Sequence, residues 1–220
     1  MSAVERDDGL VRVGAGGVTL EGNLLIPRNS TGVVLFAHGS GSSRFSSRNR
    51  YVAQELRDGG LATLLIDLLT SAEERVDMRT AHLRFDIDLL ARRLVGAMEW
   101  MSRQPATGRL PVGLFGASTG GGAALVAAAE MPERVGAVVS RGGRPDLAGA
   151  ALPNVKAPTL LIVGGDDLPV IEMNQEAYDQ MTCERRMEIV PGASHLFEEP
   201  GTLERVAELA RDWFARHLRA

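Results

Sequence analysis

Six short runs of apolar residues recur along the chain, each bounded by turn residues. A near-continuous apolar run of this length is typical of a strand buried on both faces, as in a parallel sheet covered by helices. The runs occupy Gly32–Ala37, Leu61–Ile66, Val112–Phe115, Val135–Val139, Pro158–Val163 and Met187–Val190. The pattern therefore predicts the buried strands of a parallel sheet.

Segments with helical spacing alternate with these runs. In Phe85–Met101 the apolar residues recur every three or four positions, at Ile87, Leu90, Leu94 and Met98, which is the spacing of one helix face. We expect further helices at Tyr51–Arg57, Ala123–Ala129, Ile171–Met181 and Leu203–Leu218. Alternating strands and helices predict βαβ units with right-handed crossovers.

The first segment has a different pattern. Val11–Val13 and Val18–Ile26 alternate in character and are separated by glycines, which is typical of an antiparallel hairpin. No internal repeat, linker or large insertion follows. We therefore expect residues 1–220 to form a single doubly wound α/β domain, opened by an antiparallel hairpin and lacking a separate cap domain.

Composition and charge narrow the function classes. The 24 cations and 28 acidic residues give a net charge of -4, which argues against a general nucleic-acid binder and against binding to anionic membranes. The N-terminus lacks an apolar run of signal-peptide length, and Cys183, the only cysteine, cannot form an internal disulfide. A cytoplasmic monomer or homodimer is expected. The four histidines are dispersed, so we predict neither a metal nor a cofactor.

The candidate chemistry lies after the apolar runs, because ligands of open α/β sheets bind at the carboxyl ends of the strands. Gly116-x-Ser118-x-Gly120 follows one run and precedes a helical segment. A serine on such a sharp turn projects its hydroxyl above the sheet, and the glycines let strand and helix approach closely. The helix N-terminus favours the negative charge that develops during acyl transfer.

A nucleophilic serine needs a general base and a carboxylate that orients this base. Asp166 and Asp167 follow the next suitable run, and His195 follows the last one. The order Ser, Asp, His is that of the α/β-hydrolases. At this point either aspartate could be the acid.

These motifs resemble those of α/β-hydrolases, and in particular the small dienelactone-hydrolase-like group, over nearly the whole chain. The resemblance implies a mostly parallel eight-stranded sheet whose second strand is antiparallel. It also implies the acid motif Gly164-x-x-Asp167-x-x-Val170 and the histidine motif Gly192-Ala193-Ser194-His195. Asp167 is therefore favoured over Asp166. Dienelactone hydrolases use a cysteine nucleophile, so Ser118 favours the hydrolysis of ordinary esters over that of dienelactone.

The predicted mechanism assigns a role to each residue. Ser118 attacks an acyl carbonyl, His195 transfers the proton, and Asp167 holds the histidine tautomer. The resemblance places the oxyanion loop after the His38-Gly39 step, so the backbone N–H groups of Ser40 and Thr119 are expected to bind the oxyanion. His38 is expected to fix its own loop. The alternatives are an acyltransferase and a non-catalytic binding protein with this fold.

The substrate is expected to be a small ester or lactone, because only loops (Ser40–Asn49, Thr70–His82 and Arg141–Leu152) are available to cover the site. Lys156 is the only lysine, against 23 arginines. Most of the arginines fall on predicted helix faces, and compositional bias alone could account for their number. Four lie past strand ends near the expected pocket: Arg44, Arg48, Arg141 and Arg144. Since guanidinium groups bind carboxylates and phosphates through two parallel hydrogen bonds, we expect an anionic substrate bound by Arg141 or Arg144, with Arg44 as a further candidate.

Overall fold

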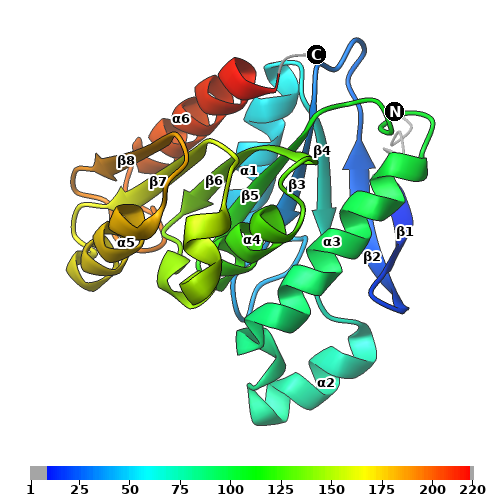
Figure 1. Ribbon diagram of the computed structural model, residues 1–220, viewed down its shortest axis with the longest axis horizontal. Coiled ribbons are helices and arrows are strands. Elements are labelled where there is room, and N and C mark those ends of the chain that lie inside the picture. Colours follow the sequence, from blue (N-terminus) through cyan, green and yellow to red (C-terminus); the bar gives the residue numbers. More distant parts are fainter. Residues whose placement is uncertain (1–8, 219–220) are drawn as a thin grey trace, which may run out of the picture.

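The computed structural model describes residues 9–218, which form one eight-stranded sheet in the order β1-β2-β4-β3-β5-β6-β7-β8 (Figure 1). β2 runs antiparallel to both of its neighbours, and the remaining strands pair in parallel. The strands are β1 Leu10–Ala15, β2 Val18–Leu25, β3 Val33–Ala37, β4 Ala62–Ile66, β5 Val112–Ala117, β6 Val135–Arg141, β7 Thr159–Gly164 and β8 Arg185–Val190. This arrangement confirms the predicted fold class, including the antiparallel second strand.

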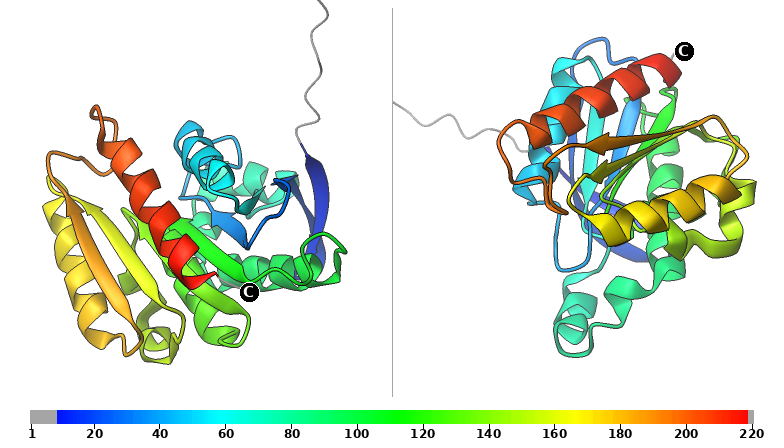
Figure 2. Two further views of the ribbon diagram at one scale, coloured as in Figure 1. Left: turned by 90° about the horizontal axis from the view of Figure 1, so that it is seen from above. Right: turned by 90° about the vertical axis from the view of Figure 1, so that its left-hand side faces the viewer.

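Helices cover both faces of the sheet (Figure 2). On one face α3, α4 and α5 pack over one apolar cluster, and on the other α1 and α6 pack over a second cluster. The helices are α1 Ser47–Asp58, α2 Ser71–Thr80, α3 Ile87–Arg103, α4 Thr119–Glu130, α5 Leu168–Gln180 and α6 Thr202–His217, with 3-10 segments η1 Leu83–Phe85 and η2 Pro145–Asn154. Every residue of β3, β4, β5 and β7 is buried, which explains why these strands appear in the sequence as near-continuous apolar runs.

The N-terminal hairpin forms as expected. Ala15 pairs with Val18 across a turn in which Gly16 and Gly17 have φ angles of 57° and 80°. Residues that carry a side chain rarely adopt such backbone angles, so glycine is required at this turn. Within residues 9–218, none of the helices combines the length and the apolar character needed to cross a membrane.

Helix α2 corrects the expectation that Thr70–His82 is a loop. Asp77 is its one buried residue, so the segment has no apolar stripe and hydrophobic periodicity does not reveal it. The overlooked signal is the capping box. The hydroxyl of Thr70 accepts the N–H of Glu73, and the Glu73 carboxylate accepts the N–H of Thr70. With the adjoining η1, α2 projects from the body of the molecule (Figure 1).

Candidate active site

Ser118 lies on a strained turn between β5 and α4. Its φ and ψ angles are 51° and -124°, a combination that costs a non-glycine residue conformational energy and concentrates at functional sites. A Cβ atom at Gly116 would lie 2.5 Å from the carbonyl oxygen of Gly120. The glycines of the Gly-x-Ser-x-Gly motif are therefore required by the close approach of strand and helix.

The surrounding backbone holds this turn in place. The N–H of Ser118 donates to the carbonyl oxygen of Arg141, at 3.3 Å. The carbonyl oxygen of Ser118 accepts the N–H groups of Gly121 and Arg144, at 2.9 and 3.0 Å. The end of β6 and the loop after it thus determine where the serine stands.

The loops after β7 and β8 bring an aspartate to His195. The Nδ1 atom of His195 lies 2.6 Å from Oδ2 of Asp167, whose side chain is 14% exposed. Asp166 is exposed, and its N–H donates to the carbonyl oxygen of Ala193. The structure therefore places Asp167, and not Asp166, beside the histidine. Because the Asp167 carboxylate accepts a hydrogen bond from Nδ1, Nε2 is the ring atom of His195 that can take a proton.

A carboxylate that sequence reasoning did not single out supports the histidine loop. Oε2 of Glu199 accepts the N–H of Ser194, at 3.0 Å. Hydrogen bonding from the side chain of Ser194, and then from its backbone N–H, lowers the pKa of Glu199 below its usual range. Glu199 thus fixes the backbone just before His195. The short spacing from Ser194 to Glu199 is a sequence cue that could have suggested this contact.

Ser118 and His195 line the same hollow, whose volume is about 340 Å³. Ser40, Arg48 and Arg141 also line it. Its floor is the carboxyl end of the central strands, where ligands of open α/β sheets bind. The structure thus brings the serine, the histidine–aspartate pair and an arginine from four separate segments to one place.

The two predicted oxyanion donors differ in their surroundings. The N–H of Thr119 is the first of α4, so it has no acceptor within the helix. The N–H of Ser40 donates to Oγ1 of Thr119, at 2.9 Å. The Ser40 donor is therefore engaged by a neighbouring side chain in this structure.

His38 fixes its loop, as its sequence context indicated. Its Nε2 atom accepts the N–H of Leu68, at 3.1 Å, and its Nδ1 atom lies 2.9 Å from the carbonyl oxygen of Gly39. Burial lowers the pKa of His38. The Nε2 contact thus joins the end of β3 to the end of β4, and the Nδ1 contact lies within the loop after β3.

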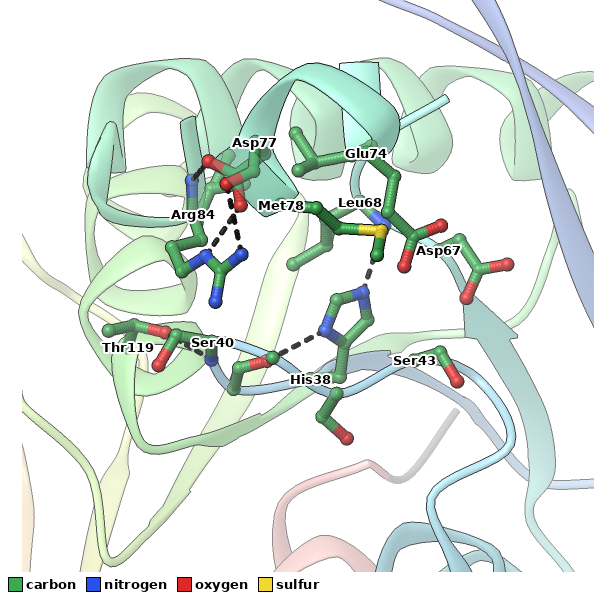
Figure 3. Close-up of a pocket in the computed structure, with 15 residues that line it drawn as sticks. His38, Ser40, Ser43, Asp67, Leu68, Glu74, Asp77, Met78, Arg84 and Thr119 are labelled. Atoms are coloured by element: carbon green, nitrogen blue, oxygen red, sulfur yellow. Dashed lines mark hydrogen bonds and ion pairs between the residues drawn. The ribbon is translucent and has the colours of Figure 1, made fainter. Parts of the chain in front are cut away.

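A second hollow, of about 310 Å³, lies between α2 and the loop after β3 (Figure 3). Leu68, Met78 and Leu90 contribute to its lining. Asp77 is 2% exposed and accepts a charged hydrogen bond from Nε of Arg84, at 2.5 Å. Burial alone would raise the pKa of Asp77, but hydrogen bonds from Arg84 and from the N–H of Leu83 outweigh it, so the pKa is lowered.

The three candidate arginines have different environments. Arg44 forms ion pairs with Asp67 and Glu21 and donates to Asn23, so its side chain holds the β3–α1 loop against the end of β4. Arg144 donates two hydrogen bonds to Asp146, at 2.9 and 2.7 Å. Of the three, Arg141 is the one that lines the hollow of Ser118. The structure does not bring Arg44 or Arg144 to this wall, because each is held by a carboxylate elsewhere.

Metal-binding residues do not cluster in the part of the chain that the structure describes. Among residues 9–218, no three His, Cys, Asp or Glu side chains lie in an arrangement that could hold a metal ion.

The sheet topology and the serine, aspartate and histidine at three strand ends define an α/β-hydrolase fold. Residues 20–219 match the model of the Dienelactone hydrolase family, and the chain belongs to this family. This result confirms the resemblance inferred from the motifs.

Solved structures agree with this assignment. The chain is 68% identical to a dienelactone hydrolase from Anabaena variabilis, with a TM-score of 0.94, and the match covers 96% of this chain and 97% of that one. Est1E from Butyrivibrio proteoclasticus is 15% identical, with a TM-score of 0.78 and coverage of 95% and 98%. At that identity the likeness to Est1E shows the fold alone.

Two curated relatives from Mycobacterium tuberculosis strains carry the name "Putative phosphoribosyl transferase". Each is 59% identical over 208 residues, which is 94% of this chain but 46% of the relative. The chain therefore spans about half the length of these relatives.

Proposed function

We propose that this protein is a serine hydrolase that cleaves small carboxylic esters or lactones through an acyl-enzyme on Ser118. The observation that carries the proposal is the 2.6 Å contact between Asp167 and His195 at the hollow that the strained Ser118 also lines. A nucleophile, a base and an orienting carboxylate are the three groups that acyl transfer needs. Membership of the Dienelactone hydrolase family supports a hydrolase.

The proposed reaction begins at the Ser118 hydroxyl. Oγ attacks the acyl carbon, and its proton passes to Nε2 of His195, while Asp167 stabilises the resulting imidazolium. The tetrahedral intermediate collapses, the bond to the alcohol oxygen breaks, and His195 protonates this leaving group. Water then attacks the acyl-enzyme, with His195 taking the proton of the water molecule. The carboxylic acid leaves, and the proton returns to Ser118.

The intermediate carries negative charge on the former carbonyl oxygen. The N–H of Thr119 and the N-terminus of α4 supply positive potential beside Ser118. One well-placed donor in such an oxyanion hole lowers the activation free energy by about 3 to 4 kcal/mol. Ser40 is the proposed second donor, although its N–H is bound to the Thr119 hydroxyl here.

The hollow favours compact substrates. Its volume of about 340 Å³ is near the lower end of the range for small-molecule sites, which is about 300 to 1,000 Å³. Serine in place of the cysteine of dienelactone hydrolases favours ordinary esters. With a lactone the same steps would open the ring, and the acid and the alcohol would remain on one product.

The mycobacterial relatives that carry the phosphoribosyl transferase name are about twice as long as this chain. The groups on which our proposal rests lie within the matched half. We therefore assign ester hydrolysis to this chain, and we treat acyl transfer and non-catalytic binding as outcomes of the test.

The test compares wild type with Ser118→Ala on p-nitrophenyl acetate, p-nitrophenyl butyrate and a small lactone. We expect kcat to fall about 10⁶-fold, as it does when the nucleophile of a serine hydrolase is removed. Ser102→Ala is the matched control, because its hydroxyl donates to the carbonyl oxygen of Glu99 and does not line the hollow. It should change kcat less than twofold.

Three further results would decide between the alternatives. A fluorophosphonate should label wild type at Ser118 and should not label Ser118→Ala. Product analysis with an added alcohol would reveal acyl transfer as transesterified product. A wild-type protein inert to all esters, to the lactone and to the fluorophosphonate would leave the binding-protein alternative.

A further inference from the structure

Arg141 is tied directly to the nucleophile turn. It is the last residue of β6, it pairs with Ala117 at the end of β5, and its carbonyl oxygen accepts the N–H of Ser118. Its side chain lines the hollow together with Ser118 and His195. The guanidinium group therefore belongs to the wall against which a substrate of Ser118 would lie.

This guanidinium group is buried without a counter-ion. Arg141 is 7% exposed, and its Nε and Nη1 atoms are buried with no hydrogen-bond partner among the described residues. The guanidinium carbon lies 5.9 Å from the centre of the Phe197 ring, a contact too weak to replace a carboxylate. Leaving a buried charge unpaired is strongly destabilising. An unpaired buried cation is expected where a site is built to bind an anion.

Arg48 adds a second positive charge to the same wall. Arg48 comes from α1 and lines the hollow. Its Nη1 atom donates a hydrogen bond to Oε1 of Glu198, at 3.0 Å. Its Nε atom is buried without a partner within residues 9–218. Burial, and to a lesser extent repulsion by Arg48, lowers the pKa of Arg141 to about 10. At neutral pH Arg141 therefore remains protonated, and two like charges face one hollow.

No compensating carboxylate lines this hollow. Among the residues of the described chain that form its wall, none is Asp or Glu. Asn49 also lines it, and its buried side-chain oxygen has no partner there. Since an amide can be turned to present its nitrogen instead, Asn49 could donate to an anion. The wall thus offers the donors of Arg141 and the Nε atom of Arg48, whereas Glu198, which accepts Nη1 of Arg48, does not line the hollow.

We propose that the unpaired guanidinium of Arg141 forms an anion-binding subsite, supported by the nearby charge of Arg48, which Glu198 holds through Nη1, and that the substrate of Ser118 is an ester or lactone carrying a carboxylate or phosphate group. A planar guanidinium matches either anion through two parallel hydrogen bonds. This inference rests on the proposed function for its catalytic part, but anion binding can be measured without catalysis. The ligand chemistry is a compact oxyanion held next to the ester bond.

The first experiment compares matched esters. 4-Carboxyphenyl acetate carries the anion on the leaving group, and its methyl ester is the neutral analogue. p-Nitrophenyl hydrogen glutarate and p-nitrophenyl valerate form the corresponding pair with the anion on the acyl group. A charge-assisted hydrogen bond corresponds to about a 10- to 100-fold preference. We expect wild type to prefer the anionic member of at least one pair by this factor in kcat/KM.

Arg141→Gln should abolish this preference, which is measured in each variant as the ratio of kcat/KM for the anionic ester to kcat/KM for the neutral ester. Arg48→Gln should reduce the preference several-fold; because Arg48 is partly exposed, this variant keeps the test decisive if Arg141→Gln does not fold. Arg50→Gln is the matched control, since it removes a positive charge from the same helix outside the hollow. Equal losses on anionic and neutral esters, or an unchanged preference in Arg48→Gln when Arg141→Gln does not fold, would overturn the proposal.

The second experiment separates the subsite from the reaction. Calorimetric titration of wild type and Ser118→Ala with benzoate and with phenyl phosphate should show binding that Arg141→Gln weakens at least tenfold. The probe with the lower dissociation constant identifies whether the subsite prefers a carboxylate or a phosphate. If no ester is hydrolysed but this binding is found, the proposed function fails and the subsite stands. If neither probe binds, or if binding survives in Arg141→Gln, the subsite is refuted.

Discussion

Two hollows share the Gly39–Ser42 loop as a wall, and they differ in whether their buried charges are paired. In the hollow beneath α2, Asp77 is paired with Arg84 and Asp67 with Arg44. In the hollow of Ser118, Arg141 has no carboxylate partner among the described residues. The two volumes are similar, about 310 and 340 Å³.

The difference separates structural charges from charges available to a ligand. A paired and hydrogen-bonded ion has its desolvation offset inside the protein, so it holds elements together. Here the pairs join α2 to η1 and the β3–α1 loop to the end of β4. An unpaired buried cation has no such role. Pairing, and not the mere presence of arginine near a strand end, therefore indicates where an anion would bind.

The largest expected effect concerns the Ser118 hollow. Asp167→Asn should lower kcat for p-nitrophenyl acetate by about 10⁴-fold, because the wrong histidine tautomer would face Ser118. Steady-state kinetics of the purified variant would measure this loss. Circular dichroism should show an unchanged fold, since the amide keeps the shape of the carboxylate.

Asp166→Asn is the matched control for this prediction. The Asp166 side chain is exposed, and its backbone N–H makes the contact to Ala193 in either variant. Its kcat should stay within threefold of wild type. Equal or reversed losses in the two variants would show that the wrong aspartate was assigned to His195.

The next effect tests the structural character of the α2 hollow. Asp77→Asn should lower the free energy of unfolding by about 1.5 to 3 kcal/mol, the usual contribution of a hydrogen bond to a charged group. The kcat/KM for p-nitrophenyl acetate should stay within twofold. Urea denaturation and kinetics would measure the two quantities. Glu99→Gln, in an exposed pair with Arg103, should cost less than about 1 kcal/mol.

The same variant predicts a pH dependence. The pKa of Asp77 is lower in the folded protein than in the unfolded chain, where an aspartate titrates near about 3.9. The stabilisation is therefore complete above this unfolded pKa and is lost as the pH falls through the folded pKa. The stability difference between wild type and Asp77→Asn should shrink on acidification below about pH 4. If Asp77→Asn instead abolishes ester hydrolysis while folded, the α2 hollow belongs to the substrate site.

The sequence predicts the fold well because strands buried on both faces are mostly apolar along their whole length. Helix α3 is predictable because it carries an apolar stripe, whereas α4, which is buried along nearly its whole length, is predictable from its run of small apolar residues. Helix α2 was missed because it buries little more than Asp77. Its stability comes from a capping box and charged contacts, including the pair of Glu73 and Arg93, and these leave no periodic signal.

Some features of the candidate site can likewise be predicted from the sequence, and others cannot. The order of Ser118, Asp167 and His195 is visible because each follows an apolar run. The partners of the arginines are not, because Glu21 and Asp67 reach Arg44 only when β2 and β4 pair in the sheet. The contact of Arg144 with Asp146, two residues away, could have been anticipated from spacing. That Arg141 has no carboxylate partner within residues 9–218 becomes visible only in the packed structure.

The smallest expected effect lies where the two hollows meet. Oγ1 of Thr119 accepts the N–H of Ser40, and Ser40 borders both hollows. Thr119→Val removes this acceptor with little change of shape, so the loop that carries Ser40 should lose its position. One net hydrogen bond is worth about 1 kcal/mol, which corresponds to about a fivefold lower kcat, and KM should stay within twofold. Thr119→Ser keeps the hydroxyl and should behave as wild type. A higher kcat in Thr119→Val would mean that the Thr119 hydroxyl holds the Ser40 N–H away from the oxyanion.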